Sequence, residues 1–395
     1  MSEIFLTIAV LFGQTGAFIS LLNRKLVNTK HSWFRAMAMT LAVAFLIGLP
    51  LAALFLLHRR GILSDLAHFR CPRAGVWLLA AYLAALLAAA ARFLWVSLVT
   101  LPRRKRPPIV VAEKQSLHLY QPEDDQKAKG IWAWRVPNLF SRLNCRFDLE
   151  VNEFVLMPPD LPQAFDGFSI VHLSDIHAMR TRPEGWYDFV ATAVEQLEPD
   201  LIAITGDFLV DGDDFVRIER VLPRLRAPRG VWAILGNHDL WEAPDKLRDL
   251  LARRGIGLLT NRRTEIGFNG ATLDLVGVES PWNRPTVAWR ELFDMSSRRT
   301  TIVLSHTPDN APTLARMGVT LMLAGHTHGG QIRLPWIGSL IVPSRYGKRY
   351  DQGWFTIGSL PVYVNRGIGA YSPDMRLACR PEITRFVLRA SGPKT

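Results

Sequence analysis

The sequence has few cysteines and no bias toward a single structural amino acid. Three cysteines, Cys71, Cys145 and Cys379, occur in 395 residues, without the spacing of a disulfide framework or a thiolate metal site. We therefore expect reduced thiols, although Cys145 and Cys379 can meet in a fold. The 25 prolines and 28 glycines are ordinary for a globular protein, which excludes a repeat or low-complexity chain.

Most of the chain also lacks an excess of charge. Residues 1–106 hold 13 of the 47 Lys and Arg residues and 2 of the 35 Asp and Glu residues, whereas residues 107–395 hold 34 and 33. Of the net charge of +12, the N-terminal part therefore carries +11 and the rest of the chain +1. A folded domain that binds nucleic acid would carry the excess itself, so no nucleic-acid partner is expected.

What the N-terminal part does contain is long apolar runs, at residues 4–22, 36–57 and 74–99. The second has no charged residue over a length that crosses a hydrocarbon core of about 30 Å. The first contains Gln14 and Thr15, and a cleaved signal peptide is the alternative, but no basic segment precedes it, which favours a retained helix. The third contains Arg92, whose side chain can extend to the headgroups. We expect a membrane anchor of two or three transmembrane helices over residues 1–106.

Basic residues between these runs predict the orientation of the anchor. The groups at residues 24–35 and 103–106 fall on one side and together hold eight basic residues, and the group at 59–73 holds four. Because loops rich in Lys and Arg stay in the cytoplasm, the part of the chain after the anchor is expected there.

The rest of the chain divides into a polar segment and a domain. Residues 107–145 show little periodicity and are interpreted as a linker or a connector that lies on the surface. Beyond them, helical patterns at residues 187–197 and 244–253 alternate with short apolar runs. Strands are expected at residues 147–156, 168–173, 201–205, 231–235, 302–304, 321–323, 361–365 and 383–388. This alternation predicts a layered α/β domain over residues 146–390, followed by a tail at 391–395.

Residue types that bind metals follow five of the buried runs. They are Asp175 with His177, Asp207, Asn237 with His238 and Asp239, His306, and His326 with His328. Since ligands bind beyond the carboxyl ends of strands in α/β sheets, we expect these loops to converge on one site. Carboxylates and imidazoles without thiolates suit two divalent cations, with Mn preferred and Fe, Zn or Mg as alternatives. Asp207 is the candidate for the carboxylate that bridges them.

The order Asp-x-His, Gly-Asp, Gly-Asn-His-Asp, His and Gly-His-x-His resembles the calcineurin-like metallophosphoesterase superfamily over residues 146–390. The segments at residues 325–331, 345–348 and 365–369 are similar to its bacterial branch with N-terminal transmembrane helices. The resemblance implies a β-sandwich flanked by helices after an α-helical membrane domain in the bacterial inner membrane. It also implies that one metal is held by Asp175, His177, Asp207 and His328, and the other by Asp207, Asn237, His306 and His326.

The resemblance further implies that His238 faces the substrate and is not a ligand. The family usually has an acid three residues after the bridging Asp, where it pairs with this histidine. Here Val210 holds that position and Asp211 follows it, so Asp211, Asp175 and Asp239 remain alternative partners. We expect His238 to stabilise the transition state or protonate the leaving oxygen while a water activated by the cations attacks phosphorus.

Other residues near the motifs allow two interpretations each. Arg345 and Arg366 are candidates for binding the substrate phosphate, although a surface charge or a fold-locking ion pair is an equal alternative. His172 lies in an apolar run and is interpreted as a core histidine. The aromatic residues Trp282, Trp336 and Phe355 are interpreted as core or lid.

The predicted function is hydrolysis of a phosphoester or pyrophosphate bond, on a lipid-linked substrate because the domain is anchored at a bilayer. Some relatives of the bacterial branch cleave the pyrophosphate of UDP-2,3-diacylglucosamine, which is the specific alternative that the resemblance implies. A broad phosphodiesterase is another enzymatic alternative, and a membrane scaffold or sensor is the alternative without catalysis.

Overall fold

The computed structural model describes residues 106–121, 144–180, 182–210, 215–283, 289–293, 299–334, 338–339, 341–371 and 374–391, together with Ala88. Apart from Ala88, the three predicted transmembrane runs lie outside these ranges, and among the described residues no helix is long and apolar enough to cross a membrane. Contacts divide the chain into one unit of residues 1–103 and 335–349 and another of residues 104–334 and 350–395. The second unit contains the layered domain.

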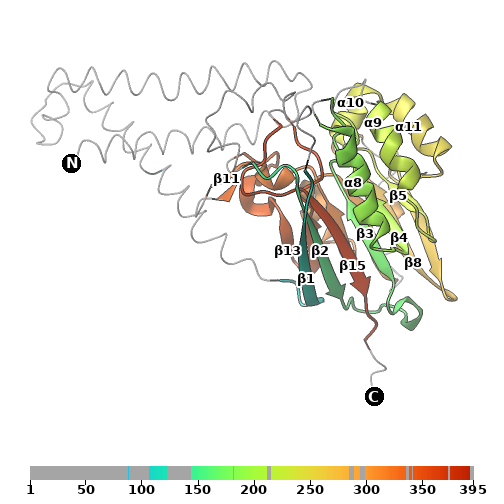
Figure 1. Ribbon diagram of the computed structural model, residues 1–395. Coiled ribbons are helices and arrows are strands. Elements are labelled where there is room, and N and C mark those ends of the chain that lie inside the picture. Colours follow the sequence, from blue (N-terminus) through green and yellow to red (C-terminus); the bar gives the residue numbers. More distant parts are fainter. Residues whose placement is uncertain are drawn as a thin grey trace, which may run out of the picture. The chain divides into compact units, whose positions relative to one another are not determined.

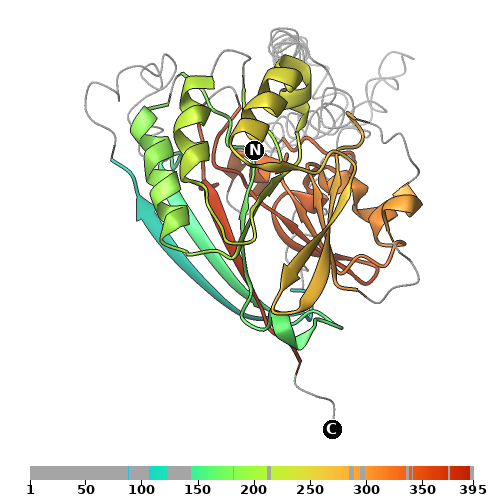
Figure 2. The same ribbon diagram turned by 90° about the vertical axis from the view of Figure 1, so that its right-hand side faces the viewer.

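Two mixed β-sheets form the centre of this domain (Figures 1 and 2). The first sheet has the order β1 (Val110–Leu119), β2 (Asp148–Leu156), β15 (Glu382–Leu388), β3 (Ser169–Leu173), β4 (Leu201–Ile204), β5 (Val231–Ala233) and β6 (Gly257–Leu258). The second has the order β13 (Gly353–Ile357), β14 (Leu360–Val364), β10 (Leu321–Ala324), β9 (Thr301–Ser305), β8 (Ala271–Val278) and β7 (Arg263–Phe268). Strands β3 to β6 run parallel to one another, as do β8, β9, β10 and β14.

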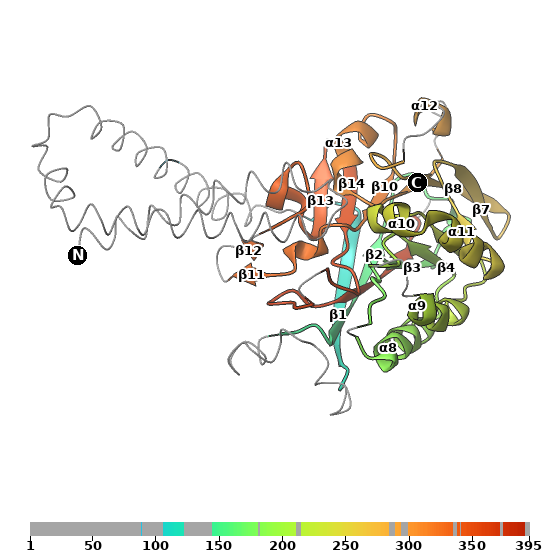
Figure 3. The same cartoon turned by 90° about the horizontal axis from the view of Figure 1, so that it is seen from above.

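Helices cover the outer faces of the two sheets (Figure 3). The α-helices are α8 (Glu184–Glu195), α9 (Phe215–Val221), α10 (Asn237–Glu242), α11 (Pro244–Arg253), α12 (Trp289–Leu292) and α13 (Ala311–Leu314). The remaining short elements are η3 (Gln163–Phe165), η4 (Leu222–Arg224), η5 (Pro308–Asn310), η6 (His328–Gly330), η7 (Gly347–Tyr350), β11 (Arg333–Leu334) and β12 (Gly338–Ser339). Helices α8, α9 and α11 lie on one side of the sandwich, and α12 and α13 lie on the other (Figure 3).

The alternation of side chains along each strand creates three apolar layers. On β4, Ile202 and Ile204 pack under α8, α9 and α11, whereas Leu201 and Ala203 face the second sheet. The far face of the second sheet packs against α12 and α13 through residues such as Val303. Because successive strand residues point to opposite faces, a strand that is apolar throughout must be covered on both sides. This confirms the predicted layered α/β fold.

The linker prediction is wrong for residues 110–119, which form β1. The strand pairs antiparallel with β2 at the edge of the first sheet, and most of its side chains are exposed. An edge strand with one open side carries charged residues such as Glu113 and Lys114, so its sequence has the polarity of a linker. The predicted helix at residues 187–197 begins earlier, at Glu184.

The two described cysteines are free and buried, which agrees with the expected reduced thiols. The Cys145 thiol donates a hydrogen bond to the backbone oxygen of Arg376, at 3.2 Å. Burial raises the pKa of the Cys145 thiol, so this sulfur stays protonated. Cys71 lies outside the described residues.

Candidate metal centre

The seven predicted ligands meet at one place, although they come from both sheets. The loops after β3, β4, β9 and β10, together with the first residue of α10, supply Asp175, His177, Asp207, Asn237, His306, His326 and His328. All seven side chains are buried, at 5% exposure or less. Parallel strands bring their carboxyl ends to one edge of a sheet. In this domain the ligands lie where this edge of the first sheet meets the corresponding edge of the second.

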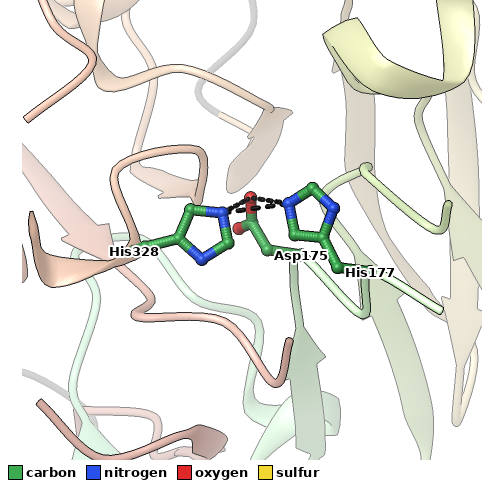
Figure 4. Close-up of side chains that lie close together, drawn as sticks. All are labelled: Asp175, His177 and His328. Atoms are coloured by element: carbon green, nitrogen blue, oxygen red, sulfur yellow. Dashed lines mark hydrogen bonds and ion pairs between the residues drawn. The ribbon is translucent and has the colours of Figure 1, made fainter. Parts of the chain in front are cut away.

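The first group of ligands is Asp175, His177 and His328 (Figure 4). The Nε2 atom of His328 lies 3.3 Å from Oδ1 of Asp175, and Nε2 of His177 lies 3.9 Å from the same oxygen. The two Nε2 atoms are 3.0 Å apart. Ligand atoms that each lie about 2.0–2.2 Å from one cation are separated by distances of this size.

The second group is Asp207, His306 and His326, with Asn237 beside them. The Nε2 atom of His306 lies 3.2 Å from Oδ2 of Asp207 and 3.1 Å from Oδ1 of Asn237. It also lies 3.2 Å from Nδ1 of His326. The Nδ1 atom of His306 faces the backbone oxygen of Thr205 at 2.7 Å, which leaves Nε2 unprotonated when the ring is neutral.

Asp207 lies between the two groups. Its Oδ2 atom, which faces His306, is also 3.5 Å from Nε2 of His177 in the first group. Its other oxygen accepts a hydrogen bond from the backbone N–H of His238 at 2.9 Å. The carboxylate is therefore oriented by the backbone and presents one oxygen to both groups, as a bridging ligand requires.

The protonation states of three of the four histidines suit metal binding. Burial lowers the pKa of His177 to about 3 and lowers the pKa values of His326 and His328 well below their ordinary value. A neutral imidazole can offer a ring nitrogen to a divalent cation, and the facing Nε2 atoms of His177 and His328 are close enough to bind the same one. The residues present therefore fit two divalent cations.

The carboxylates of the two groups differ in their pKa. Burial raises the pKa of Asp175 to about 6. Burial alone would also raise the pKa of Asp207, but His306, followed by His238, holds it well below its ordinary value. His306 shows the converse, because burial lowers its pKa but Asp207 raises it to about 9. Asp207 thus keeps its negative charge in this site, as its bridging position requires.

The backbone at five of the seven ligands lies in the left-handed region that L-residues rarely adopt. The φ angles are 47° at Asp175, 44° at His177, 55° at Asp207, 70° at His326 and 51° at His328. Such conformations cost of order 1 kcal/mol or more each and persist only where the surroundings enforce them. Here, for example, the backbone N–H of Asp175 donates to the oxygen of Gly206 at 2.9 Å. Strain concentrated at the ligands indicates a functional site.

Glycines allow the loops to approach the ligands closely. A Cβ atom on Gly236 would lie 2.1 Å from Oδ1 of Asp207 and 2.6 Å from its backbone nitrogen. Gly367 and Gly369 act similarly, because their Cβ atoms would lie 2.6 Å from Cβ of Asp175 and 2.4 Å from Cβ of His177. The glycines of the segment at residues 365–369 therefore serve the packing of the first group.

We expect Gly236→Ala to displace the Asp207 carboxylate. A shift of about 1 Å at a reacting centre can cost about 100-fold in rate, and we expect a loss of this size together with reduced metal content. Metal analysis and turnover of the variant test this. Gly267→Ala on β7 is the matched control, because a Cβ there meets nothing within 4 Å. Wild-type metal content in Gly236→Ala would contradict the assigned contact.

Comparison with known proteins identifies the family. The profile of the calcineurin-like phosphoesterases matches residues 168–330. The chain is 33% identical over 249 residues to the uncharacterized metallophosphoesterase YkuE of Bacillus subtilis, covering 62% of this chain and 87% of that protein. This chain is a calcineurin-like metallophosphoesterase. It is accordingly a metal-dependent phosphoric ester hydrolase, and the residues that match the family include both groups described above.

Two other relatives of this metallophosphoesterase carry more specific names. Phosphodiesterase YaeI of Escherichia coli is 34% identical over 230 residues, covering 56% of this chain and 82% of that protein. The UDP-2,3-diacylglucosamine pyrophosphatase LpxG of Chlamydia trachomatis is 25% identical over 281 residues, covering 57% of this chain and 85% of that protein.

In this metallophosphoesterase His238 lies beside the metal centre without belonging to either group. Its ring centre is 5.0 Å from that of His177, and its side chain is half-buried. Its Nδ1 atom lies 3.4 Å from the backbone oxygen of Val210. The partner of the His238 ring is thus the backbone oxygen of Val210 and not the side chain of an acidic residue, as the resemblance had led us to expect.

The alternative acids have other roles or lie outside the described residues. Asp239 accepts hydrogen bonds from the backbone N–H groups of Phe208, Leu209 and Gly236, so it fastens the loop after β4 to α10. Burial and Asp207 raise the pKa of Asp239 to about 8. The carboxylate of Asp175 faces His177 and His328 in the first group of ligands. Asp211 is not among the described residues.

The structure favours the interpretation that Arg366 stabilises the fold through ion pairs. Its guanidinium is paired with Glu150 on β2 and Glu382 on β15, and all three side chains are at most 12% exposed. Burial alone would lower the pKa of Arg366, but the two carboxylates raise it above its ordinary value. The cation is thus already neutralised within the fold. Arg345 belongs to the other unit of the chain, and its role in substrate binding stays a prediction.

We expect Arg366→Met to lower the free energy of unfolding by about 3–5 kcal/mol, because it leaves two buried carboxylates without their cation. Denaturant unfolding measures this, and Arg248→Met, on the exposed face of α11, is the control. A variant with wild-type stability but a raised KM would instead support the original substrate-binding prediction.

Aromatic side chains surround the metal centre. The ring of Trp282 lies 4.8 Å from that of His326 and 5.5 Å from that of His306. Tyr371 lies 5.1 Å from His328, and Trp241 lies 5.6 Å from His238. Sequence reasoning missed Trp241 and Tyr371, although Trp241 stands three residues after His238, a spacing that shares a helix face. Phe355 is a core residue, as expected, and Trp336 lies outside the described residues.

Proposed function

We propose that this metallophosphoesterase is anchored to the bacterial inner membrane and hydrolyses a phosphoester or pyrophosphate bond of a lipid-linked substrate. The observation that carries the hydrolytic chemistry is the position of Asp207 Oδ2, within 3.5 Å of a histidine nitrogen of each group. We propose Mn²⁺ as the natural metal, since oxygen and imidazole ligands without thiolates suit it.

Two divalent cations held here would lower the pKa of a water and neutralise charge on the phosphoryl oxygens. The ligands Asp175, His177 and His328 would hold one, and Asn237, His306 and His326 the other, with Asp207 shared. His238 acts on the substrate, because its backbone is fixed by Asp207 while its ring remains half-buried. With Nδ1 donating to the oxygen of Val210, its Nε2 is available to give a proton to the leaving oxygen.

The membrane part of the proposal rests on the N-terminal sequence. The apolar runs and 13 basic residues within residues 1–106 support an integral anchor, and the eight-to-four distribution of flanking basic residues supports a cytoplasmic metal centre. An active site held near a bilayer meets lipid substrates at high local concentration. The similarity to LpxG, named as a UDP-2,3-diacylglucosamine pyrophosphatase, supports the specific proposal of that substrate.

The experiment that tests the substrate class is incubation of the Mn²⁺-loaded full-length protein with a total lipid extract and with UDP-2,3-diacylglucosamine. Mass spectrometry identifies which species disappears. We expect loss of a lipid-linked phosphoester or pyrophosphate, at a rate well above that for soluble diesters.

The second candidate function is a broad phosphodiesterase, supported by the similarity to YaeI, named as a phosphodiesterase. Equal rates on soluble and lipid-linked diesters in the same assay would favour it. Such a result would exclude the lipid-specific proposal while leaving the metal chemistry intact.

A further inference from the structure

A chain of buried side chains connects the core of the first sheet to the metal centre. It begins at His172 on β3, passes through Thr205 after β4 and Ser174 after β3, and ends at Asp175. The contacts are 2.9 Å from His172 Nε2 to Thr205 Oγ1, 2.7 Å from Thr205 Oγ1 to Ser174 Oγ, and 2.5 Å from Ser174 Oγ to Asp175 Oδ2. All four side chains are fully buried, at 0% exposure.

Counting protons fixes the direction of this chain. Asp175 must be ionised to bind a metal, so it only accepts, and Ser174 donates to it. A hydroxyl has one proton, so Ser174 must accept from Thr205, and Thr205 must in turn accept from His172. His172 therefore carries a proton on Nε2, and a neutral ring with an unprotonated Nδ1 matches the absence of a partner at that atom among the described residues. Burial lowers the pKa of His172 to about 3, which agrees with the neutral ring.

The two carboxylate oxygens of Asp175 have different partners: Oδ2 ends the chain of hydrogen bonds, and Oδ1 faces the other ligands. Oδ2 accepts from Ser174 and, at 2.9 Å, from the backbone N–H of His326, which also lies 3.2 Å from Oδ1. Oδ1 in addition faces Nε2 of His328 and Nε2 of His177. Figure 4 shows this carboxylate between the two rings. Gly325 packs directly against the hydrogen bond between Ser174 and Asp175, since a Cβ atom at position 325 would lie 1.8 Å from Ser174 Oγ. Hydrogen bonds that all point one way polarise one another, which strengthens the last bond to the carboxylate.

We propose that His172 is a positioning residue for the metal centre, acting through Thr205 and Ser174 to fix the Asp175 carboxylate. Thr205 also links this chain to the second group, because its backbone oxygen faces Nδ1 of His306 at 2.7 Å. Outer partners of metal ligands typically contribute 10- to 100-fold to metal affinity. This inference rests on the metal centre of the proposed function, and its readout is therefore Mn²⁺ affinity rather than turnover.

The test is calorimetric titration of Mn²⁺ into the metal-free full-length protein. We expect His172→Phe and Thr205→Val each to weaken one of the two Mn²⁺ sites by about 10- to 100-fold. The double variant should lose no more than either single variant, because one break interrupts the whole chain. Thr205→Ser keeps the hydroxyl and should restore wild-type affinity.

The matched control is Thr384→Val, which removes another fully buried hydroxyl from the strand paired with β3 at His172. It should bind Mn²⁺ as the wild type does. Wild-type affinity in His172→Phe and Thr205→Val, or an equal loss in Thr384→Val, would overturn the proposal. Ser174→Ala, with the same expected loss, decides the question if Thr205→Val does not fold. A wild-type protein that binds no Mn²⁺ would instead contradict the proposed function.

Discussion

Asp207→Asn is expected to abolish turnover and to reduce bound metal, because it places an amide NH₂ or a neutral oxygen where one carboxylate oxygen serves both groups. Oδ2 of Asp207 lies 3.5 Å from Nε2 of His177 and 3.2 Å from Nε2 of His306. A neutral amide cannot offset the charge of two cations. The loss should therefore exceed the 10- to 100-fold that removal of an outer partner of a metal ligand typically costs.

Metal content and kcat of the purified Asp207→Asn variant measure this effect. Asp245→Asn is the control, since it removes one carboxylate from the exposed face of α11, where the side chain of Asp245 is 93% exposed. The circular dichroism spectrum should be unchanged in both variants. Retention of two metal ions and wild-type turnover in Asp207→Asn would show that another group bridges the cations.

His238→Ala is expected to lower kcat by about 10²- to 10⁴-fold while leaving the metal content intact. The ring contacts neither group as a ligand, and its Nδ1 atom is directed at the Val210 oxygen, so its removal leaves all seven ligands in place. His118→Ala on the edge strand β1 is the control and should retain full activity.

The dependence of this loss on the leaving group separates the two roles open to His238. A proton donor matters most when the leaving oxygen is basic, so an alkyl phosphodiester should lose far more rate than a p-nitrophenyl one. An equal loss for both would assign His238 to stabilising the phosphoryl oxygens. Unchanged kcat with both substrates would remove it from the mechanism.

The metal centre was predictable because its chemistry is local in the sequence. Each ligand follows a short buried strand, and the parallel strands bring these loops together without any information about distant packing. Asp207 could be selected as the bridge because two cations need a shared carboxylate. The partner of His238 was not predictable in this way, since the backbone oxygen of Val210 has no signature in the side-chain sequence.

Elements at the sheet edges were harder to predict than the central strands. Strand β1 pairs on one side only and most of its side chains are exposed. Its sequence therefore lacks the alternation of apolar and polar residues that predicts a strand. The hairpin of β7 and β8 was also missed, although Asn269 and Gly270 join the two strands with φ angles of 48° and 83°. An Asn-Gly pair between two alternating segments is a strong signal of such a turn.

Arg366 illustrates a limit of a different kind. An arginine in a segment after a buried strand fits phosphate binding as well as it fits an ion pair. Its partners Glu150 and Glu382 come from β2 and β15, and only their pairing in the sheet brings the two carboxylates to one place. The interpretation therefore depended on strand order, which local sequence does not specify.

The most direct test of the central claim is metal analysis of the full-length protein combined with turnover of bis(p-nitrophenyl) phosphate. We predict two metal ions per chain, hydrolysis that stops when a chelator removes them, and recovery on addition of Mn²⁺. A folded protein that binds at most one metal ion, or that shows no hydrolysis with Mn²⁺, Fe²⁺, Zn²⁺ or Mg²⁺, would contradict the account.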